Sequence, residues 1–255
     1  MEEQSLKLVP KEDVLTTSSD KPGMTGLVET FLRRFRTLAF ILFIAPLGAV
    51  CCLSIGLALS PAIFVFHTVS HLSADWVMPL RYVALGCGIS MAFMTYGFSL
   101  VFIVPAVNLL MPRVRAFRGP WYSLGAIPWY THNGLTYMVR YTFLDFITPT
   151  PVNILFYRMM GMKIGKGVMI NTSNISDPCM ITLGDYVTVG GSAHLLAHYG
   201  QKGYLVIAPV KIGHGTNIGL KASIMGGAQI GEKVMIKPHA AVLPRTEIPD
   251  GSTVD

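Results

Sequence analysis

The sequence predicts a membrane protein of mixed α and β structure, in which a hairpin of two transmembrane helices carries a parallel β-helix. Three observations predict it. Hydrophobic residues make up 51% of the 255-residue chain and charged residues only 13%, a balance far from that of soluble domains. Two long segments carry no charge. In the C-terminal third, aliphatic residues recur at every sixth position.

The two uncharged segments, residues 37–66 and 83–111, are each longer than the roughly 20 residues that cross a bilayer as a helix. The segment between them has Arg81 alone against Asp75. Two buried helices of a soluble protein are the disfavoured alternative. The positive-inside rule predicts a multi-pass protein of the cell's inner (plasma) membrane with both chain ends cytoplasmic, because arginines flank the outer ends of the hairpin: Arg33, Arg34, Arg36, Arg113, Arg115 and Arg118.

Four regions are expected along the chain. Residues 1–25 are polar and mix both charge signs, which predicts a disordered tail before the transmembrane unit at 26–118. Residues 119–160 mix aromatic side chains with single charges, which is typical of amphipathic helices at a membrane surface. We expect this linker to be a structural collar that lays residues 161–255 against the bilayer.

Two smaller features have a plain interpretation and a sharper one. His67 and His71 stand four residues apart at the outer end of the first span, so a helix would place them on one face. A metal site is conceivable there, but two side chains at headgroup level is the preferred interpretation. The four cysteines are too scattered for a disulfide framework, and we expect reduced thiols.

The six-residue period continues in one frame from Ile212 to Val254, and the same frame appears upstream at 164–170 and 183–195. Helices do not repeat at six. Each unit is expected to form one flat face of a triangular prism, so that three units complete a coil and stacked coils bury the aliphatic column. Thirteen residues separate Ile170 from Leu183, which predicts a single-residue insertion, and seventeen separate Leu195 from Ile212, which predicts a protruding loop at 198–208.

The run from ISDPCMITLGDYVTVGGSAHLLAHYGQKG to MIKPHAAV resembles the hexapeptide-repeat acyltransferase superfamily. The resemblance covers roughly residues 160–255 and implies that the parallel β-helix is left-handed and forms a homotrimer. A two-helix membrane unit followed by this repeat also resembles the membrane-embedded C-terminal units of nonribosomal-peptide-synthetase-like proteins of the poly-lysine synthetase type. Repeats of this kind are diagnostic of fold more than of substrate.

The resemblance implies a direct transfer of an acyl group from a thioester to an amine or hydroxyl, with acyl-CoA or acetyl-CoA as donor and no metal. In the family a histidine near the start of the excursion loop acts as general base, and His198 matches it, with His194 as the second candidate. An imidazole can accept a proton near neutral pH. The donor would lie in a groove between subunits against glycines and lysines, for which the candidates are Gly213, Gly215, Gly226, Gly227, Lys221 and Lys237.

The acceptor is expected to be lipid-linked or amphipathic, because the anchor holds the site close to the bilayer. The sequence ends at IPDGSTVD, before the Gly-x-Pro-Ala element that often closes such domains and helps to cover coenzyme A. A carrier-bound thioester therefore stays open as the donor.

Two other functions share this predicted fold. A γ-type carbonic anhydrase would need three histidines from two subunits around zinc, but that family places one ligand far upstream of a close pair, whereas the close pair His194 and His198 comes first here. A non-catalytic trimeric scaffold of a membrane assembly is also open. His214 and His239 are expected at coil surfaces, and no nucleic acid partner is expected because topology accounts for the arginine clusters.

Overall fold

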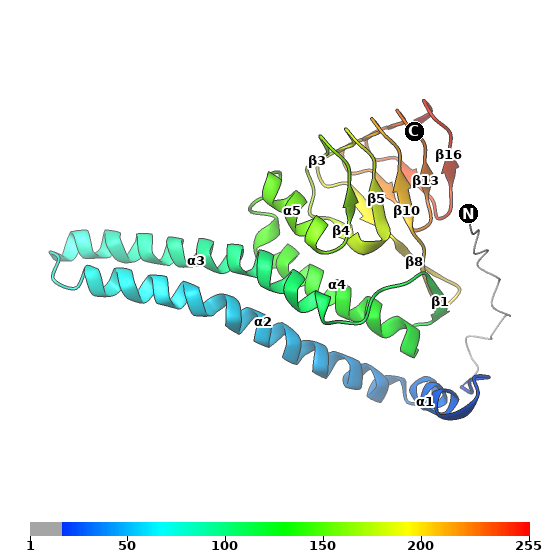
Figure 1. The fold of residues 1–255 in the computed structure, drawn as a ribbon, viewed down its shortest axis with the longest axis horizontal. Helices are drawn as coiled ribbons and strands as arrows, with labels where there is room; N and C mark the ends of the chain where they lie inside the picture. The colour runs from blue at the N-terminus through cyan, green and yellow to red at the C-terminus, as the bar shows by residue number, and fades with distance from the viewer. Residues whose placement is uncertain (1–16) are drawn as a thin grey trace.

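The computed structural model describes residues 17–255, which form a helical hairpin, a layer of short helices and a three-sided β coil (Figure 1). Most of the tail expected at 1–25 lies outside the described residues, and the first helix begins at Gly23. The helices are α1 (Gly23–Arg34), α2 (Arg36–Leu72), α3 (Met78–Leu109), α4 (Ile127–Val139) and α5 (Pro151–Met159), with 3-10 turns η1 (Leu124–Ala126) and η3 (Pro178–Met180) and a π-helical turn η2 (Arg140–Leu144).

The hairpin of α2 and α3 projects away from the coil (Figure 1). These helices have 37 and 32 residues and are long and apolar enough to cross a membrane. The core helix of a soluble protein buries most of its side chains, but only 11% of the most hydrophobic window of α2 and 28% of that of α3 are buried. The hairpin thus presents apolar side chains outward, which an apolar environment would satisfy. Helix α2 extends beyond the predicted span 37–66 at both ends. Helix α3 starts before the predicted span 83–111 and ends at Leu109, before residue 111.

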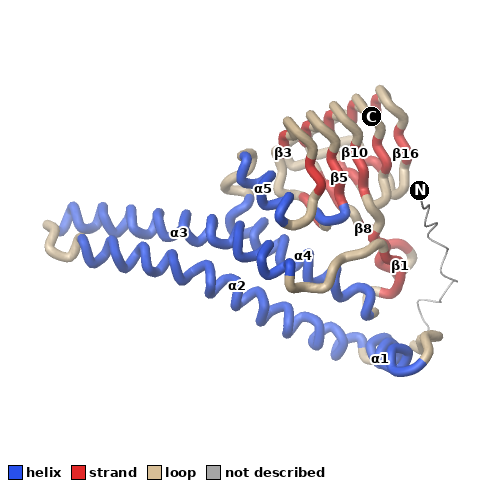
Figure 2. Tube along the Cα trace, viewed as in Figure 1, coloured by secondary structure: helices blue, strands red, loops and turns tan. Residues whose placement is uncertain are grey.

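The β coil has three faces, and each face is a parallel sheet of very short strands (Figure 2). Strands that pair are 18 residues apart in the uninterrupted part, as in Ile212 opposite Ile230 and Ile218 opposite Ile236. Three six-residue units therefore complete one turn. The faces are β16-β13-β10-β5-β2, β17-β14-β11-β6-β3 and β15-β12-β7-β4. Their strands are β2 (Lys163–Ile164), β3 (Met169–Ile170), β4 (Ile175–Ser176), β5 (Ile181–Leu183), β6 (Thr188–Val189), β7 (His194–Leu196), β10 (Val210–Ile212), β11 (Asn217–Ile218), β12 (Ser223–Ile224), β13 (Gln229–Ile230), β14 (Met235–Ile236), β15 (Ala241–Val242), β16 (Glu247–Ile248) and β17 (Thr253–Val254).

The aliphatic residues of the repeat form the predicted internal column. Ile212, Ile218, Ile224, Ile230 and Ile236 are at most 4% exposed. A second series of buried smaller side chains lies two residues before interior positions of the repeat: Val187, Ala193, Ala222, Ala228, Val234 and Ala240. The narrow interior of the prism accommodates one large and one small side chain per face, which explains the alternation.

The upstream interruption differs in detail from a single-residue insertion. Ile175 takes the interior position and is fully buried, so the repeat first shortens to five residues after Ile170 and then lengthens to eight before Leu183. The extra residues form η3, which turns the corner of the coil. Asp177 begins that corner with a φ of 58°.

The loop expected at 198–208 is a β-hairpin of β8 (His198–Gln201) and β9 (Tyr204–Ile207). Strand β1 (Phe117–Pro120), which follows the helical hairpin, pairs antiparallel with β9 and completes a small three-stranded sheet. Both Figure 1 and Figure 2 show this sheet beside the N-terminal start of α4. The segment that leaves α3 is thereby tied to the excursion loop of the coil.

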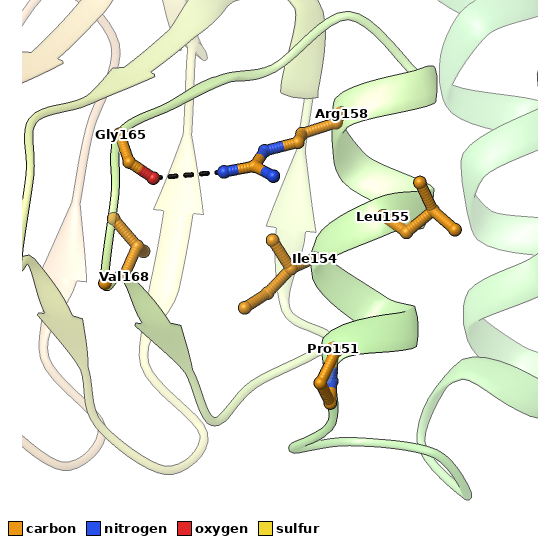
Figure 3. Close-up of a pocket in the computed structure, with 7 residues that line it drawn as sticks. Pro151, Ile154, Leu155, Arg158, Gly165 and Val168 are labelled. Atoms are coloured by element: carbon orange, nitrogen blue, oxygen red, sulfur yellow. Dashed lines mark hydrogen bonds between the residues drawn. The ribbon is translucent and has the colours of Figure 1, made fainter.

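Helix α5 covers the open end of the first coil, where a solenoid would otherwise expose its interior. Asn153 donates a hydrogen bond to the carbonyl of Ile170, and the buried Tyr157 hydroxyl donates to the carbonyl of Ser173. Figure 3 shows the small cavity that remains between α5 and the coil, with Arg158 donating to the Gly165 carbonyl at 3.0 Å. This cavity therefore lies where α5 caps the end of the coil.

Candidate functional site

One face of α4 lies against the coil and supplies side chains to it at every fourth residue. The helix starts after η1 with Pro128 in its first turn, where a missing N–H does no harm. Trp129, Asn133 and Tyr137 then fall on one face, because side chains four residues apart are neighbours on a helix. Their partners are His198, Asp177 and Ser176, respectively. The linker expected to be a collar therefore also contacts the candidate base.

Asp177 is the hub of these contacts. It is fully buried, and its carboxylate uses both oxygens. Oδ1 accepts from Asn133 Nδ2 at 2.5 Å, whereas Oδ2 accepts from the Ala197 N–H at 3.2 Å and lies 2.6 Å from Nδ1 of His198. Burying a carboxylate is costly unless such donors replace water. These donors thus fix the carboxylate in one orientation, facing His198.

The pairing determines which nitrogen of His198 is available. An ionised carboxylate can only accept hydrogen bonds, so Nδ1 carries the proton and Nε2 of the neutral ring keeps its lone pair. Within residues 17–255, Nε2 has no hydrogen-bond partner. The side chain of His198 is 18% exposed. The ring of Trp129 packs edge-on against the imidazole, with 4.9 Å between the two ring centroids. A proton acceptor on a fixed ring, partly open to solvent, is the arrangement that general base catalysis requires.

Gly226 is the candidate cofactor residue that the coil brings to His198. A Cβ at Gly226 would lie 3.0 Å from the Ala197 carbonyl and from the backbone nitrogen of His198. Such an approach is tighter than most real Cβ contacts. The glycine therefore lets the turn after β12 pack directly on the start of the excursion hairpin.

Gly227 directly follows Gly226, whereas the other candidate glycines and the lysines lie elsewhere on the coil. Gly213 lines a groove of about 620 Å³ along β10, β13 and β16. Gly215 and Gly227 adopt positive φ in turns, as does Lys221. Lys237 forms an ion pair with Asp255. The candidate cofactor residues thus do not form one surface around His198.

The other histidines are separate from this pair. His194 is exposed on β7, where it stands in register with Ser223. His214 and His239 are at turns of the coil, and Nδ1 of His214 accepts a hydrogen bond from the Asp185 N–H. His67 and His71 are exposed on α2. In the described part of the chain, no three side chains of His, Cys, Asp or Glu gather as a metal-binding group.

Cys179 lies two residues after Asp177 and is a poor nucleophile. Burial, and next the negative charge of Asp177, raise the pKa of its thiol to about 12. Because the thiolate is the reactive form of cysteine, a covalent intermediate at Cys179 is disfavoured. The chemistry available at this place is that of His198 and Asp177.

Sequence reasoning identified His198 but missed Asp177, Asn133 and Trp129. Asp177 is 21 residues before His198, and only the coil geometry brings them together. The irregular repeat around ISDPC is the signal that could have pointed to it, because an interrupted frame marks a corner with its own purpose. For α4, the four-residue spacing of Trp129, Asn133 and Tyr137 was the available signal.

Comparisons with known proteins find hexapeptide-repeat acetyltransferases among the similar solved structures. Similar solved structures include a hexapeptide-repeat-containing acetyltransferase of Vibrio cholerae complexed with acetyl coenzyme A, with 17% identity, coverage of 57% of this chain and 91% of that chain, and a TM-score of 0.41. A maltose O-acetyltransferase of Clostridium difficile has 16% identity, coverage of 55% and 88%, and a TM-score of 0.39. A serine acetyltransferase of Brucella abortus has 16% identity, coverage of 89% and 72%, and a TM-score of 0.38.

The chain resembles the hexapeptide-repeat acetyltransferases. No family model matches it. Among curated proteins it is 22% identical over 166 residues to the delta-poly-L-ornithine synthetase of Acinetobacter baumannii, a match that covers 63% of this chain and 12% of that protein. The chain thus spans about an eighth of the length of the curated relative it matches. Both predicted resemblances, to the acyltransferase superfamily and to the synthetase-like proteins, are confirmed.

Proposed function

We propose that this chain is a membrane-anchored acyltransferase that moves an acyl group from a thioester donor to an amine or hydroxyl of a membrane-associated acceptor. The observation that carries the proposal is the buried Asp177 carboxylate 2.6 Å from Nδ1 of His198, with Nε2 unpartnered within residues 17–255. A scaffold would gain nothing from burying a carboxylate against a partly exposed imidazole, because apolar packing stabilises a coil at least as well.

The proposed reaction is a direct transfer. The amine or hydroxyl of the acceptor attacks the thioester carbonyl, and its proton moves to Nε2 of His198. Asp177 stabilises the resulting imidazolium, as carboxylates do in other acid–base pairs. Collapse of the tetrahedral intermediate breaks the carbon–sulfur bond, and the departing thiolate takes the proton back from Nε2. Positioned general base catalysis of this type contributes about 10²- to 10⁴-fold.

Coenzyme A or a protein carrier would present the thioester. Acyl-CoA is the donor proposed first, since a similar hexapeptide-repeat acetyltransferase is complexed with acetyl coenzyme A. The donor would extend from His198 along the turns of the coil, and we propose that a homotrimer forms the groove between neighbouring prisms, as the resemblance implies. The groove lined by Gly213 is a surface available for a neighbouring copy.

The apolar hairpin supports a location at the membrane. The exposed apolar side chains of α2 and α3 would be shielded by lipid, and arginines such as Arg113 and Arg115 lie within six residues of the end of α3. We propose that the coil and both chain ends are on the cytoplasmic side. The short β1 strand then holds the excursion hairpin, and with it His198, close to the bilayer.

The test is thiol release from acetyl-CoA by the full chain in lipid nanodiscs, with dodecylamine as a membrane-partitioned acceptor and ethanolamine as a soluble one. We expect dodecylamine to be the better acceptor and His198→Gln to lower its acylation by 10²- to 10⁴-fold. His194→Gln is the matched control and should keep the rate. Equal loss in both variants, or turnover that survives His198→Gln, would contradict the role of His198.

A further inference from the structure

A second cavity, of about 290 Å³, lies where the end of α3, helix α4 and the turn η3 meet. Its lining residues include Asn108, Met111, Arg113, His132, Met160 and Cys179. Neither His198 nor Trp129 lines it. Asp177 nevertheless links it to the candidate active site, because Asp177 directly precedes η3 and its negative charge acts on both His132 and Cys179.

His132 lines this cavity and carries an unpaired hydrogen-bond acceptor. The side chain is 3% exposed, and its Nδ1 lies 3.0 Å from Oδ1 of Asn108. The amide oxygen can only accept, so Nδ1 carries the proton. Burial lowers the pKa of His132 to about 4, against the opposing effect of the Asp177 charge, so the ring is neutral at physiological pH. Its buried Nε2 is thus a bare lone pair, without a hydrogen-bond partner in residues 17–255.

An unpaired acceptor of this kind needs a donor from outside residues 17–255. Leaving a buried polar atom unsatisfied costs about 1–3 kcal/mol. A hydroxyl or N–H group of a ligand would satisfy Nε2 of His132. Metal binding is disfavoured, since Cys179 is the one other Cys or His side chain among the lining residues in the described part of the chain.

Arg113 adds a positive charge to the same cavity. It is exposed and lies four residues after the end of α3, whereas the lining residues within 17–255 include no carboxylate. A ligand with an anionic group beside a hydrogen-bond donor would satisfy both Arg113 and His132. Phospholipid headgroups combine these features, and basic pockets beside transmembrane helices bind them.

A neighbouring apolar cavity of about 550 Å³ lies among α1, α2 and α4. Met111 lines both cavities, and Thr131 of the apolar one is followed on α4 by His132 of the polar one. The other lining residues of the apolar cavity include Phe31, Leu42, Leu47 and Ile127. Such a surface suits an acyl chain.

We propose that the two cavities together bind one phospholipid, with its acyl chain among α1, α2 and α4, its anionic phosphodiester at Arg113, and a headgroup hydroxyl donating to Nε2 of His132. The proposal rests on the membrane location proposed above and is independent of acyl transfer at His198. The ligand class is a phospholipid that carries both net negative charge and a headgroup hydroxyl, of which phosphatidylglycerol is the probe.

The test is equilibrium binding of short-chain dioctanoyl lipids to the purified full chain, by isothermal titration below their micelle concentration. Phosphatidylglycerol should bind at least fivefold more tightly than phosphatidylmethanol, which has the same charge and phosphodiester but no hydroxyl. Phosphatidylglycerol should also bind more tightly than phosphatidylethanolamine, whose headgroup keeps a hydrogen-bond donor but has no net charge. Glycerophosphoglycerol, the headgroup without chains, should bind at least tenfold more weakly. Equal affinities for phosphatidylglycerol and phosphatidylmethanol, or for the lipid and its free headgroup, would overturn the proposal.

Two variants assign the contacts. His132→Phe should abolish the preference for phosphatidylglycerol over phosphatidylmethanol. Arg113→Gln should weaken the binding of phosphatidylglycerol at least fivefold. Arg115→Gln is the matched control, because Arg115 is exposed two residues away and outside the cavity lining. Equal weakening by Arg113→Gln and Arg115→Gln would show general surface attraction and overturn the site. If His132→Phe fails to fold, the comparison of lipids and the comparison of Arg113→Gln with Arg115→Gln still test the proposed site. Thiol release at His198 is measured separately, so failure of one proposal is distinguishable from failure of the other.

Discussion

Asp177 Oδ2 lies 2.6 Å from Nδ1 of His198, with the carboxylate fully buried and the imidazole partly exposed. The two residues come from different coils of the prism, and Asn133 of α4 holds the far oxygen of the same carboxylate. The candidate site is therefore assembled jointly by the β coil and the linker that joins it to the apolar hairpin.

Asp177→Asn tests the carboxylate. The substitution keeps the shape but removes the charge that would stabilise an imidazolium, and the asparagine amide can force His198 into the wrong tautomer. We expect acyl transfer in the nanodisc assay to fall by about 10²- to 10⁴-fold. His198→Gln combined with Asp177→Asn should be no worse than His198→Gln alone, because the two residues act as a unit. Full additivity in the double variant would contradict the pairing.

Asn133→Ala tests the contribution of α4. It removes the donor to Oδ1 of Asp177 and leaves a buried carboxylate oxygen unpaired, which should lower the free energy of unfolding by about 1–3 kcal/mol and reduce acyl transfer. Thermal unfolding and thiol release, measured on the same preparation, check both effects. Thr142→Ala serves as the control, since the Thr142 hydroxyl donates to the carbonyls of Met138 and Val139 in the preceding helical turn. An unchanged rate in Asn133→Ala would mean that α4 does not position the carboxylate.

Gly226→Ala tests the close approach to His198. The new methyl group would press on the Ala197 carbonyl and the His198 backbone nitrogen at 3.0 Å, so the start of the excursion hairpin must shift. We expect at least a tenfold loss of thiol release. The comparison is Gly200→Ala, two residues beyond His198, whose methyl would meet Trp121 at an ordinary 3.4 Å. Similar rates of thiol release in the two variants would contradict a role of Gly226 in positioning His198.

His132 predicts a specific pH dependence of stability. Burial lowers its pKa from 6.5 to about 4, so the unfolded chain binds a proton in that range that the folded chain does not. The associated stability is complete above pH 6.5 and is lost as the pH falls toward 4, with a total of at most about 3 kcal/mol. Unfolding of the full chain in detergent, followed between pH 7 and 4, should be less acid-sensitive in His132→Asn. An identical pH profile would contradict a buried neutral His132.

The coil was predictable because its determinant is local. A six-residue period with an aliphatic residue such as Ile218 or Ile230 in each unit specifies which side chains point inward, and the structure buries them as expected. His198 could be predicted as a candidate for a related reason, since it stands at the start of the long interruption of that period. Length and composition likewise revealed the hairpin, although helix α2 extends six residues past residue 66.

The features that the sequence did not predict depend on contacts between segments that are distant along the chain. Asn133 and Asp177 are 44 residues apart, and β1 pairs with β9 across more than 80 residues. Side-chain periodicity carries no information on such pairings. The shortened repeat at Ile175 was also hidden, because a five-residue unit followed by an eight-residue unit has the same total length as a six and a seven.

The most direct measurement is a density map of the full chain in nanodiscs with a stable thioether analogue of acetyl-CoA bound. The account predicts that the acyl end of the analogue lies beside Nε2 of His198, next to Gly226 and beneath Trp129. An acyl end beside His194 or in the groove at Gly213, with the Asp177–His198 pair unoccupied, would contradict it.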